Sequence, residues 1–142
     1  MDKKILVALD NSDYAIKVMH QAVELADLYK CTLYGVSVID NSYFSTGDQS
    51  DSYSDNAESF WTTTFQHVLD ECSKLAEQKD IYFQQNMING NPAEEIIKYA
   101  ADYDFDIIVL GHLGKSAASG FGIGSVAQKV AAYAKCSVLI VK

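Results

Sequence analysis

Short apolar runs alternate along this chain with longer segments whose apolar residues recur every three or four positions. The runs have the length of β-strands, and the spacing in the longer segments predicts amphipathic helices. Strict β-α alternation predicts a parallel sheet with helices on both faces and right-handed crossovers. The expected strands are 5–9, 32–39, 81–88, 106–110 and 137–141, and the expected helices are 15–28, 58–78, 92–100 and 126–134.

Two strand ends are the places to look for a ligand. Open parallel sheets bind ligands at the carboxyl ends of their strands, where the strand order reverses. Asp10 follows the first expected strand, and Gly111 follows the fourth. If these two strands are neighbours, Asp10 and the glycine-rich segment that begins at Gly111 meet at one site. Ser12 is a plausible cap for the helix that follows Asp10.

The segment 111–125 is rich in glycine, with five of the chain's eight glycines. Glycine lets backbone N–H groups approach a ligand, because no Cβ stands in the way. The expected helix 126–134 begins directly after this segment. A helix N-terminus offers unpaired N–H donors and a positive dipole end, which suits a phosphate.

Three phosphate-binding patterns can be tested on this segment. The P-loop pattern G-x4-G-K-[ST] fits Gly114, Lys115 and Ser116, but it fails because Val109 stands where its first glycine belongs. The dinucleotide pattern G-x-G-x-x-G fails because its third glycine would be Ser125. The pattern G-x2-G-x9-G-[ST] matches fully, at the end of the expected strand 106–110 and the start of the expected helix 126–134.

This third pattern is the signature of nucleotide-binding universal stress proteins, and the sequence resembles that family over essentially its whole length. The segments KKILVALDNSDYA, GNPAEEIIKYA, DIIVLGHLGKS and GSVAQKVAAYAKCSVLIVK resemble its first strand, third helix start, fourth strand and closing helix and strand. The resemblance implies one α/β domain over residues 1–142, with an open five-stranded parallel sheet in the order 3-2-1-4-5. The fold would be Rossmann-like, of the adenine nucleotide alpha hydrolase-like type. It also implies a homodimer formed through the strand Ser137–Val141, which would cover an apolar edge.

The resemblance further implies an adenine-nucleotide site for ATP, or for AMP or ADP, with Mg²⁺ or Mn²⁺ on the phosphates. Asp10 would lie near the ribose or the phosphate-bound ion, and Lys115 is a possible phosphate contact. Ser125 could cap the last helix and offer its hydroxyl to a phosphate. Leu113 departs from the family pattern, in which a polar or basic residue is common near the second glycine. The residues implied to bind the nucleotide are Ala8, Leu9, Asp10, Val38, Leu110, Gly111, Leu113, Gly114, Gly124, Ser125 and Val126.

Composition limits the other classes of function. A net charge of −8 and a pI of about 4.6 disfavour nucleic acid and anionic membranes as general partners. The three cysteines form no CxxC pair, so neither a zinc site nor a disulfide framework is expected. No signal peptide or membrane span is evident near the lysine-containing start, and a cytoplasmic location is expected.

Residues 40–57 are rich in Ser, Asp and Tyr without a clear period, and they are expected to form a long, mobile surface loop. This loop is either a solvated connection, a lid over the ligand or a contact for a partner. His112 is expected at the surface rather than as a catalytic base.

Three functions remain open at this point. The first is a nucleotide-dependent switch or sensor in the stress response. The second is a slow metal-dependent ATPase, although no nucleophile–base pair stands out and the chain contains no arginine that could stabilise a phosphoryl-transfer transition state. The third is a dimeric interaction module that works without nucleotide.

Overall fold

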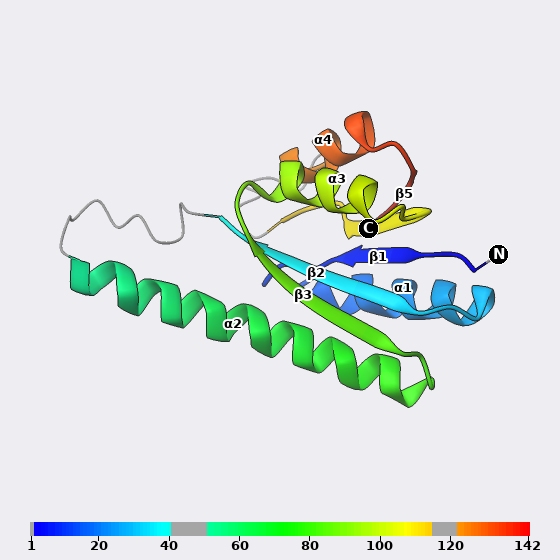
Figure 1. Cartoon of the computed structure of the whole chain (residues 1–142), viewed down its shortest axis with the longest axis horizontal. Helices are drawn as coiled ribbons and strands as arrows, with labels where there is room; N and C mark the ends of the chain where they lie inside the picture. Colours follow the sequence, from blue (N-terminus) through cyan, green and yellow to red (C-terminus); the bar gives the residue numbers. More distant parts are fainter. Residues whose placement is uncertain (1, 41–50, 115–121) are drawn as a thin grey trace.

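The computed structural model describes residues 2–40, 51–114 and 122–142, which form alternating strands and helices (Figure 1). The observed boundaries agree with the expected elements within about two residues, apart from the start of the second helix. The elements are β1 (Ile5–Ala8), α1 (Ala15–Tyr29), β2 (Leu33–Ile39), α2 (Asp51–Gln78), β3 (Phe83–Asn89), α3 (Pro92–Asp102), β4 (Ile107–Gly111), α4 (Ser125–Tyr133) and β5 (Ser137–Val141).

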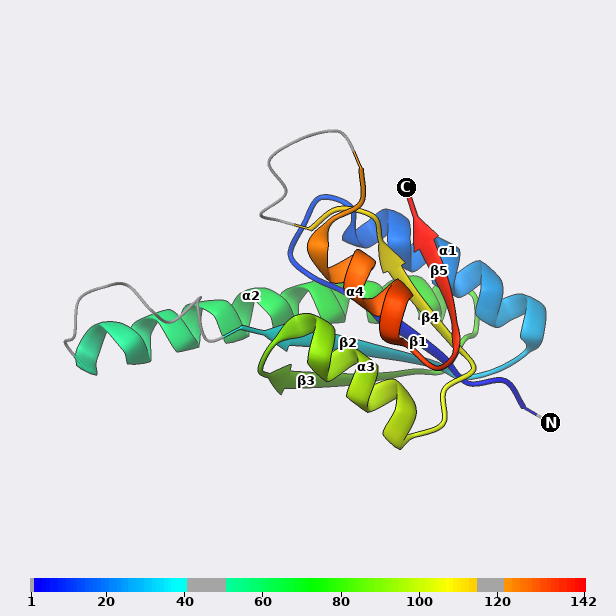
Figure 2. The same cartoon turned by 90° about the horizontal axis from the view of Figure 1, so that it is seen from above.

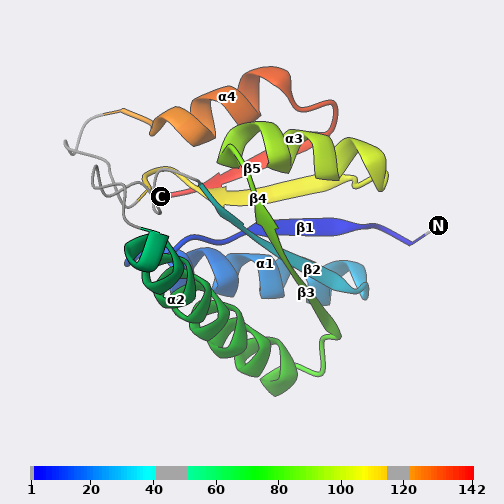
Figure 3. The same ribbon diagram turned by 60° about the vertical axis from the view of Figure 1, so that its left-hand side comes forward.

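The sheet has five parallel strands in the order β3-β2-β1-β4-β5, which confirms the expected topology. Helices α1 and α2 cover one face, and α3 and α4 cover the other (Figures 1 and 3). Strand β1 pairs with β2 on one side and with β4 on the other, so the strand order reverses between β1 and β4. Strand β1, which precedes Asp10, and strand β4, which ends at Gly111, are therefore neighbours.

Strand β1 is apolar throughout because both of its faces are covered. Ile5 and Val7 pack in the core under α1 and α2, whereas Leu6 packs on the other side with residues of α3 and α4. All three side chains are fully buried, and each such burial stabilises the fold by roughly 1.5–3 kcal/mol. The continuous apolar run, rather than an alternating one, follows from this two-sided burial.

The expected loop over 40–57 was too long, because α2 already begins at Asp51. Residues 51–57 contain no glycine or proline that would stop a helix. Figure 2 shows the first turns of α2 extending beyond the sheet, where there is no core for them to cover. Residues 51–57 therefore lack the three-to-four spacing of apolar residues that predicts a helix, although their backbone is helical. Residues 41–50 lie outside the described residues.

Of the three expected helix caps, the one at Asn91 is confirmed, whereas Ser12 and Ser125 do not cap their helices. Asn91 Oδ1 accepts the N–H of Glu94 at 3.1 Å, with Pro92 at the first helical position of α3. Ser12 does not cap α1, because the helix begins only at Ala15; its hydroxyl instead accepts the N–H of Tyr14 at 3.3 Å.

Candidate functional site

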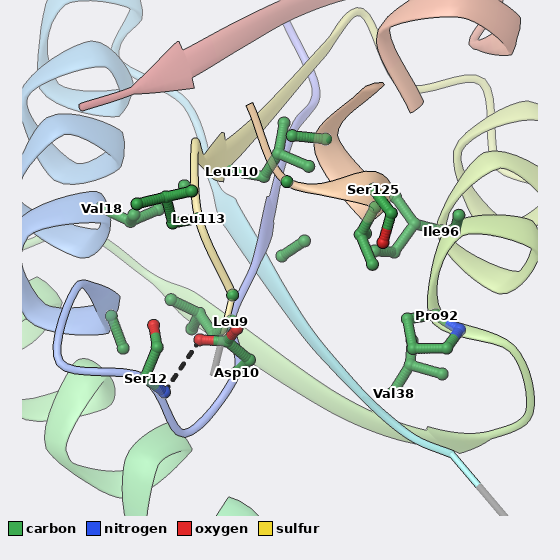
Figure 4. Close-up of a pocket in the computed structure, with 18 of the residues that line it drawn as sticks. Leu9, Asp10, Ser12, Val18, Val38, Pro92, Ile96, Leu110, Leu113 and Ser125 are labelled. Atoms are coloured by element: carbon green, nitrogen blue, oxygen red, sulfur yellow. Dashed lines mark hydrogen bonds between the residues drawn. The ribbon is translucent and has the colours of Figure 1, made fainter. Parts of the chain in front are cut away.

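A cavity of about 590 Å³ lies at the carboxyl edge of the sheet. The ends of β1, β2 and β4 form its floor, and the first turns of α3 and α4 contribute to its wall (Figure 4). Its volume is in the range of small-molecule sites, and it lies where the strand order reverses. This is the position that the topology favours for a ligand.

The structure brings the expected site residues together at this cavity. Lys115, the possible phosphate contact, lies outside the described residues. The residues that line the cavity include all eleven expected ones: Ala8, Leu9, Asp10, Val38, Leu110, Gly111, Leu113, Gly114, Gly124, Ser125 and Val126.

Asp10 is held in place by the backbone on both sides of it. The N–H of Leu9 donates to Val36 O at 2.9 Å, and the Ser37 hydroxyl donates to Leu9 O at 2.8 Å. Asp10 Oδ1 accepts the N–H of Ser12 at 2.9 Å (Figure 4). Ser37 is fully buried, so its hydroxyl supplies the Leu9 carbonyl with a hydrogen bond from inside the protein. Asp10 therefore extends a fixed carboxylate into the cavity.

The two halves of the glycine motif are in direct contact. The N–H of Gly124 donates to His112 O at 2.6 Å, across the segment that separates them in sequence. A Cβ on Gly124 would lie 3.3 Å from that oxygen and 3.5 Å from Leu113 Cα. Glycine at this position therefore favours the close approach of the two chain segments, because any side chain would press on backbone atoms.

Gly111 lines the cavity, and it also lies close to α1. A Cβ at this position would lie 3.2 Å from Cγ2 of Val18, in the first turn of α1. The absence of a side chain lets the end of β4 pack closely against α1. The next glycine, Gly114, faces the carboxylate of Asp10, with Oδ2 at 3.4 Å from the position of an added Cβ.

Helix α4 presents its N-terminus to the cavity without a side-chain cap. Ser125 does not act as the cap, because it is the first helical residue and Gly124 occupies the cap position. The first N–H groups of a helix have no acceptor within the helix, and they carry the positive end of its dipole. The N-terminus of α3 also lines the cavity, but the Asn91 side chain and Pro92 already satisfy or replace two of its donors. Of these two helix ends, α4 is the better suited to an anion.

Several residues of the cavity were not expected from the sequence. Asp40 follows β2, and Lys129 lies in the second turn of α4, where its Nζ is 3.2 Å from Glu94 Oε1 on α3. Asp40 could have been found from its place at a strand end. Glu94 and Lys129 are far apart in sequence, and no local pattern pairs them. Residues at the start of α3 also line the cavity, although the segment GNPAEEI predicted only that a helix begins there: Asn91, Pro92, Ala93 and Ile96.

His112 is half-buried and lines the cavity. Its ring lies edge-on to the ring of Tyr14, with 5.1 Å between the centroids. The Nδ1 atom is buried and has no hydrogen-bond partner among the described residues. The ring of the histidine therefore packs against Tyr14, which precedes α1, while its backbone oxygen accepts the N–H of Gly124.

In the described parts of the chain, no group of three or more His, Cys, Asp or Glu side chains is placed to hold a metal ion. Within the same residues, no helix has both the length and the apolar character needed to cross a bilayer.

Comparisons with known proteins agree with this architecture. The sequence profile of the universal stress protein family matches residues 1–142. A universal stress protein of Methanocaldococcus jannaschii is 31% identical over 140 residues, which cover 99% of this chain and 82% of the relative.

Solved structures of the same fold include complexes with adenine nucleotides. A universal stress protein in complex with cAMP is 21% identical, with a TM-score of 0.74 over 99% of this chain and 97% of its own. The universal stress protein of Archaeoglobus fulgidus in complex with dAMP is 23% identical, with a TM-score of 0.71 and full coverage of both chains. The profile match over the whole chain, together with the relative above 30% identity, shows that this chain belongs to the universal stress protein family.

Proposed function

We propose that the cavity binds an adenine nucleotide and that the protein acts as a nucleotide-dependent switch or sensor in the stress response. One observation carries the proposal: the uncapped N-terminus of α4 and the fixed carboxylate of Asp10 face the same cavity. The helix end suits a phosphate, and a carboxylate accepts hydrogen bonds from sugar hydroxyls. The cAMP and dAMP complexes of proteins with this fold support the same ligand class.

The cavity has an apolar side that suits a base. In Figure 4, Val38 and Pro92 lie on one side of the hollow, and Asp10 and Ser12 lie on the other. Ala8 and Leu110 add further apolar surface at the ends of β1 and β4. A purine ring can bury its faces against these side chains while its sugar and phosphates extend toward the glycine loop and α4.

A divalent ion would enter with the phosphates rather than bind on its own. The carboxylates of Asp10 and Asp40 line the cavity, but no group of three or more His, Cys, Asp or Glu side chains among the described residues is placed to hold a metal ion. Mg²⁺ commonly binds through one or two carboxylates, substrate phosphates and water. We therefore expect Mg²⁺ or Mn²⁺ to strengthen the binding of ATP and to leave the binding of adenosine unchanged.

Calorimetry of the nucleotide-free protein tests this function. ATP, ADP and AMP are titrated with and without Mg²⁺, and GTP serves as the control for base selectivity. Saturable heat with an adenine nucleotide supports the proposal, and the absence of heat at millimolar concentrations of all three would refute it. Mass spectrometry of any nucleotide released on denaturation identifies the ligand that copurifies with the protein.

We also propose that the protein forms a homodimer through β5. Within the described chain, β5 pairs only with β4, which leaves its outer edge open, and Leu139 is 38% exposed there. Such an edge is normally covered, and a second copy can cover it by a two-fold contact. Light scattering should give a dimer mass that Leu139→Glu lowers. Leu28→Glu is the matched control, because Leu28 is 79% exposed on α1, and a wild-type monomer at micromolar concentration would contradict the dimer.

A further inference from the structure

Lys129 lies where it can reach a ligand at the N-terminus of α4. It stands four residues after Ser125, so the two share one face of the helix, and both line the cavity. Long side chains on a helix lean toward its N-terminus, which directs Lys129 toward the uncapped first turn. Lys129 is the one lysine among the described residues that line the cavity, and the chain contains no arginine.

The ammonium group of Lys129 already has a partner, but one that it can exchange. Its Nζ lies 3.2 Å from Oε1 of Glu94, in the first turn of α3, and the two side chains are 43% and 65% exposed. An ion pair this exposed contributes little to stability. Glu94 also interacts favourably with the dipole of α3, so its carboxylate tolerates the loss of Lys129.

The remaining charges at the cavity are unfavourable for a phosphate chain. The carboxylates of Asp10 and Asp40 line it, and the whole chain carries a net charge of −8. The dipole end of α4 can balance only a fraction of a unit charge. A ligand with several phosphate charges therefore needs a cation nearby, and Lys129 is the described group in position to supply it.

We propose that Glu94 and the phosphates of the nucleotide compete for Lys129, so that the site distinguishes ligands by the number of their phosphate charges. Without ligand, Lys129 links α4 to α3 through Glu94. With a phosphorylated ligand, Lys129 moves to the phosphate oxygens and the link is broken. This inference rests on the proposed nucleotide site and adds a selectivity residue and its competitor to it. It also gives the switch a structural consequence, because α3 and α4 form one layer of the fold.

Four proteins test the competition: wild type, Lys129→Met, Glu94→Gln and the double variant, each titrated with adenosine, AMP and ATP. Lys129→Met should weaken ATP binding about tenfold and leave adenosine binding unchanged, since one charge-assisted hydrogen bond is lost. Glu94→Gln should strengthen ATP binding, because the competitor is neutral. In the double variant the gain from Glu94→Gln should disappear, which measures the coupling of the two residues.

A matched control removes another lysine from an ion pair. Lys98→Met breaks the pair of Lys98 with Asp102 on α3, in which Nζ and Oδ2 are 3.0 Å apart and neither residue lines the cavity. This variant should bind all three ligands as the wild type does, and circular dichroism should show that every variant is folded. An unchanged ratio of ATP to adenosine affinity in Lys129→Met, with binding intact, would overturn the inference alone. If the wild type binds none of the ligands, the proposed function fails first and the inference with it.

Discussion

The backbone N–H of Gly124 donates to the carbonyl oxygen of His112 at 2.6 Å. This bond joins the end of β4 to the start of α4, although these chain segments are separated in sequence. It places the N-terminus of α4 beside Gly114, which faces the carboxylate of Asp10. The spacing of the glycine motif thus describes a contact between two segments as well as a possible contact with a ligand.

Replacing Gly124 by leucine should therefore disturb both the fold and the site. Its Cβ would lie 3.3 Å from His112 O and 3.5 Å from Gly114 N, and backbone atoms cannot move aside as a flexible side chain could. We expect a loss of about 1–3 kcal/mol in the free energy of unfolding, with loss of nucleotide binding. Urea unfolding and calorimetry measure the two effects. Ala132→Leu introduces the same side chain at an exposed position on α4 and should leave both unchanged within about 0.5 kcal/mol.

The buried hydroxyl of Ser37 gives a second prediction. Ser37→Ala leaves the oxygen of Leu9 without the donor that it has at 2.8 Å. An unsatisfied buried acceptor costs about 1–3 kcal/mol, which should appear in urea unfolding. Because Leu9 precedes Asp10, the affinity for adenine nucleotide should fall as well. Ser59→Ala, at an exposed position of α2, is the control; an equal loss in both variants would show that the bond to Leu9 is not the cause.

The fold could be predicted because its determinants are local and repeated. Each buried strand is a short apolar run, and the helix start at Asn91 and Pro92 follows from the chemistry of the two residues. The meeting of Asp10 and Gly114 could be predicted too, since a parallel sheet brings the carboxyl ends of neighbouring strands to one edge.

Other features could not be found in this way because they depend on distant segments. The pair of Glu94 and Lys129 joins two helices, and neither residue stands out from other exposed charges. The start of α2 was missed because a helix that extends beyond the sheet has no apolar face to reveal it. The close approach of Gly111 to Val18 was not foreseen, because only the tertiary structure brings the end of β4 against α1.

The cap of α3 can be tested separately from the ligand. Asn91→Ala removes the acceptor for the N–H of Glu94, and the free energy of unfolding should fall by about 1 kcal/mol. Asn91→Asp keeps an acceptor and adds a charge that the helix dipole favours, so it should match or exceed the wild type. Thermal unfolding of the three proteins decides this. If Asn91→Asp were as unstable as Asn91→Ala, the role of Asn91 as the cap of α3 would be contradicted.

Stability at high pH should depend on Cys72. Burial, and to a lesser degree the charge of Glu71, raises the pKa of this thiol from 9.0 to about 12. Between these values the unfolded chain releases the proton and the folded chain retains it, so the unfolded state binds fewer protons. The free energy of unfolding must then fall as the pH rises above about 9, by up to about 1.4 kcal/mol per pH unit from this group.

Comparison with Cys72→Ala isolates this effect from the titration of lysines and tyrosines. The alanine variant should be less stable at neutral pH, because the buried sulfur leaves a small cavity, but it should lose less stability between pH 8 and about pH 10. Cys31 and Cys136 remain in both proteins; burial raises the pKa of each thiol, so they contribute with the same sign to both. The difference between the two pH profiles therefore reports Cys72 alone. Parallel profiles would show that the thiol is ionised in the folded protein as readily as in the unfolded chain, and that it is not held in the apolar core formed by α1, α2 and the sheet.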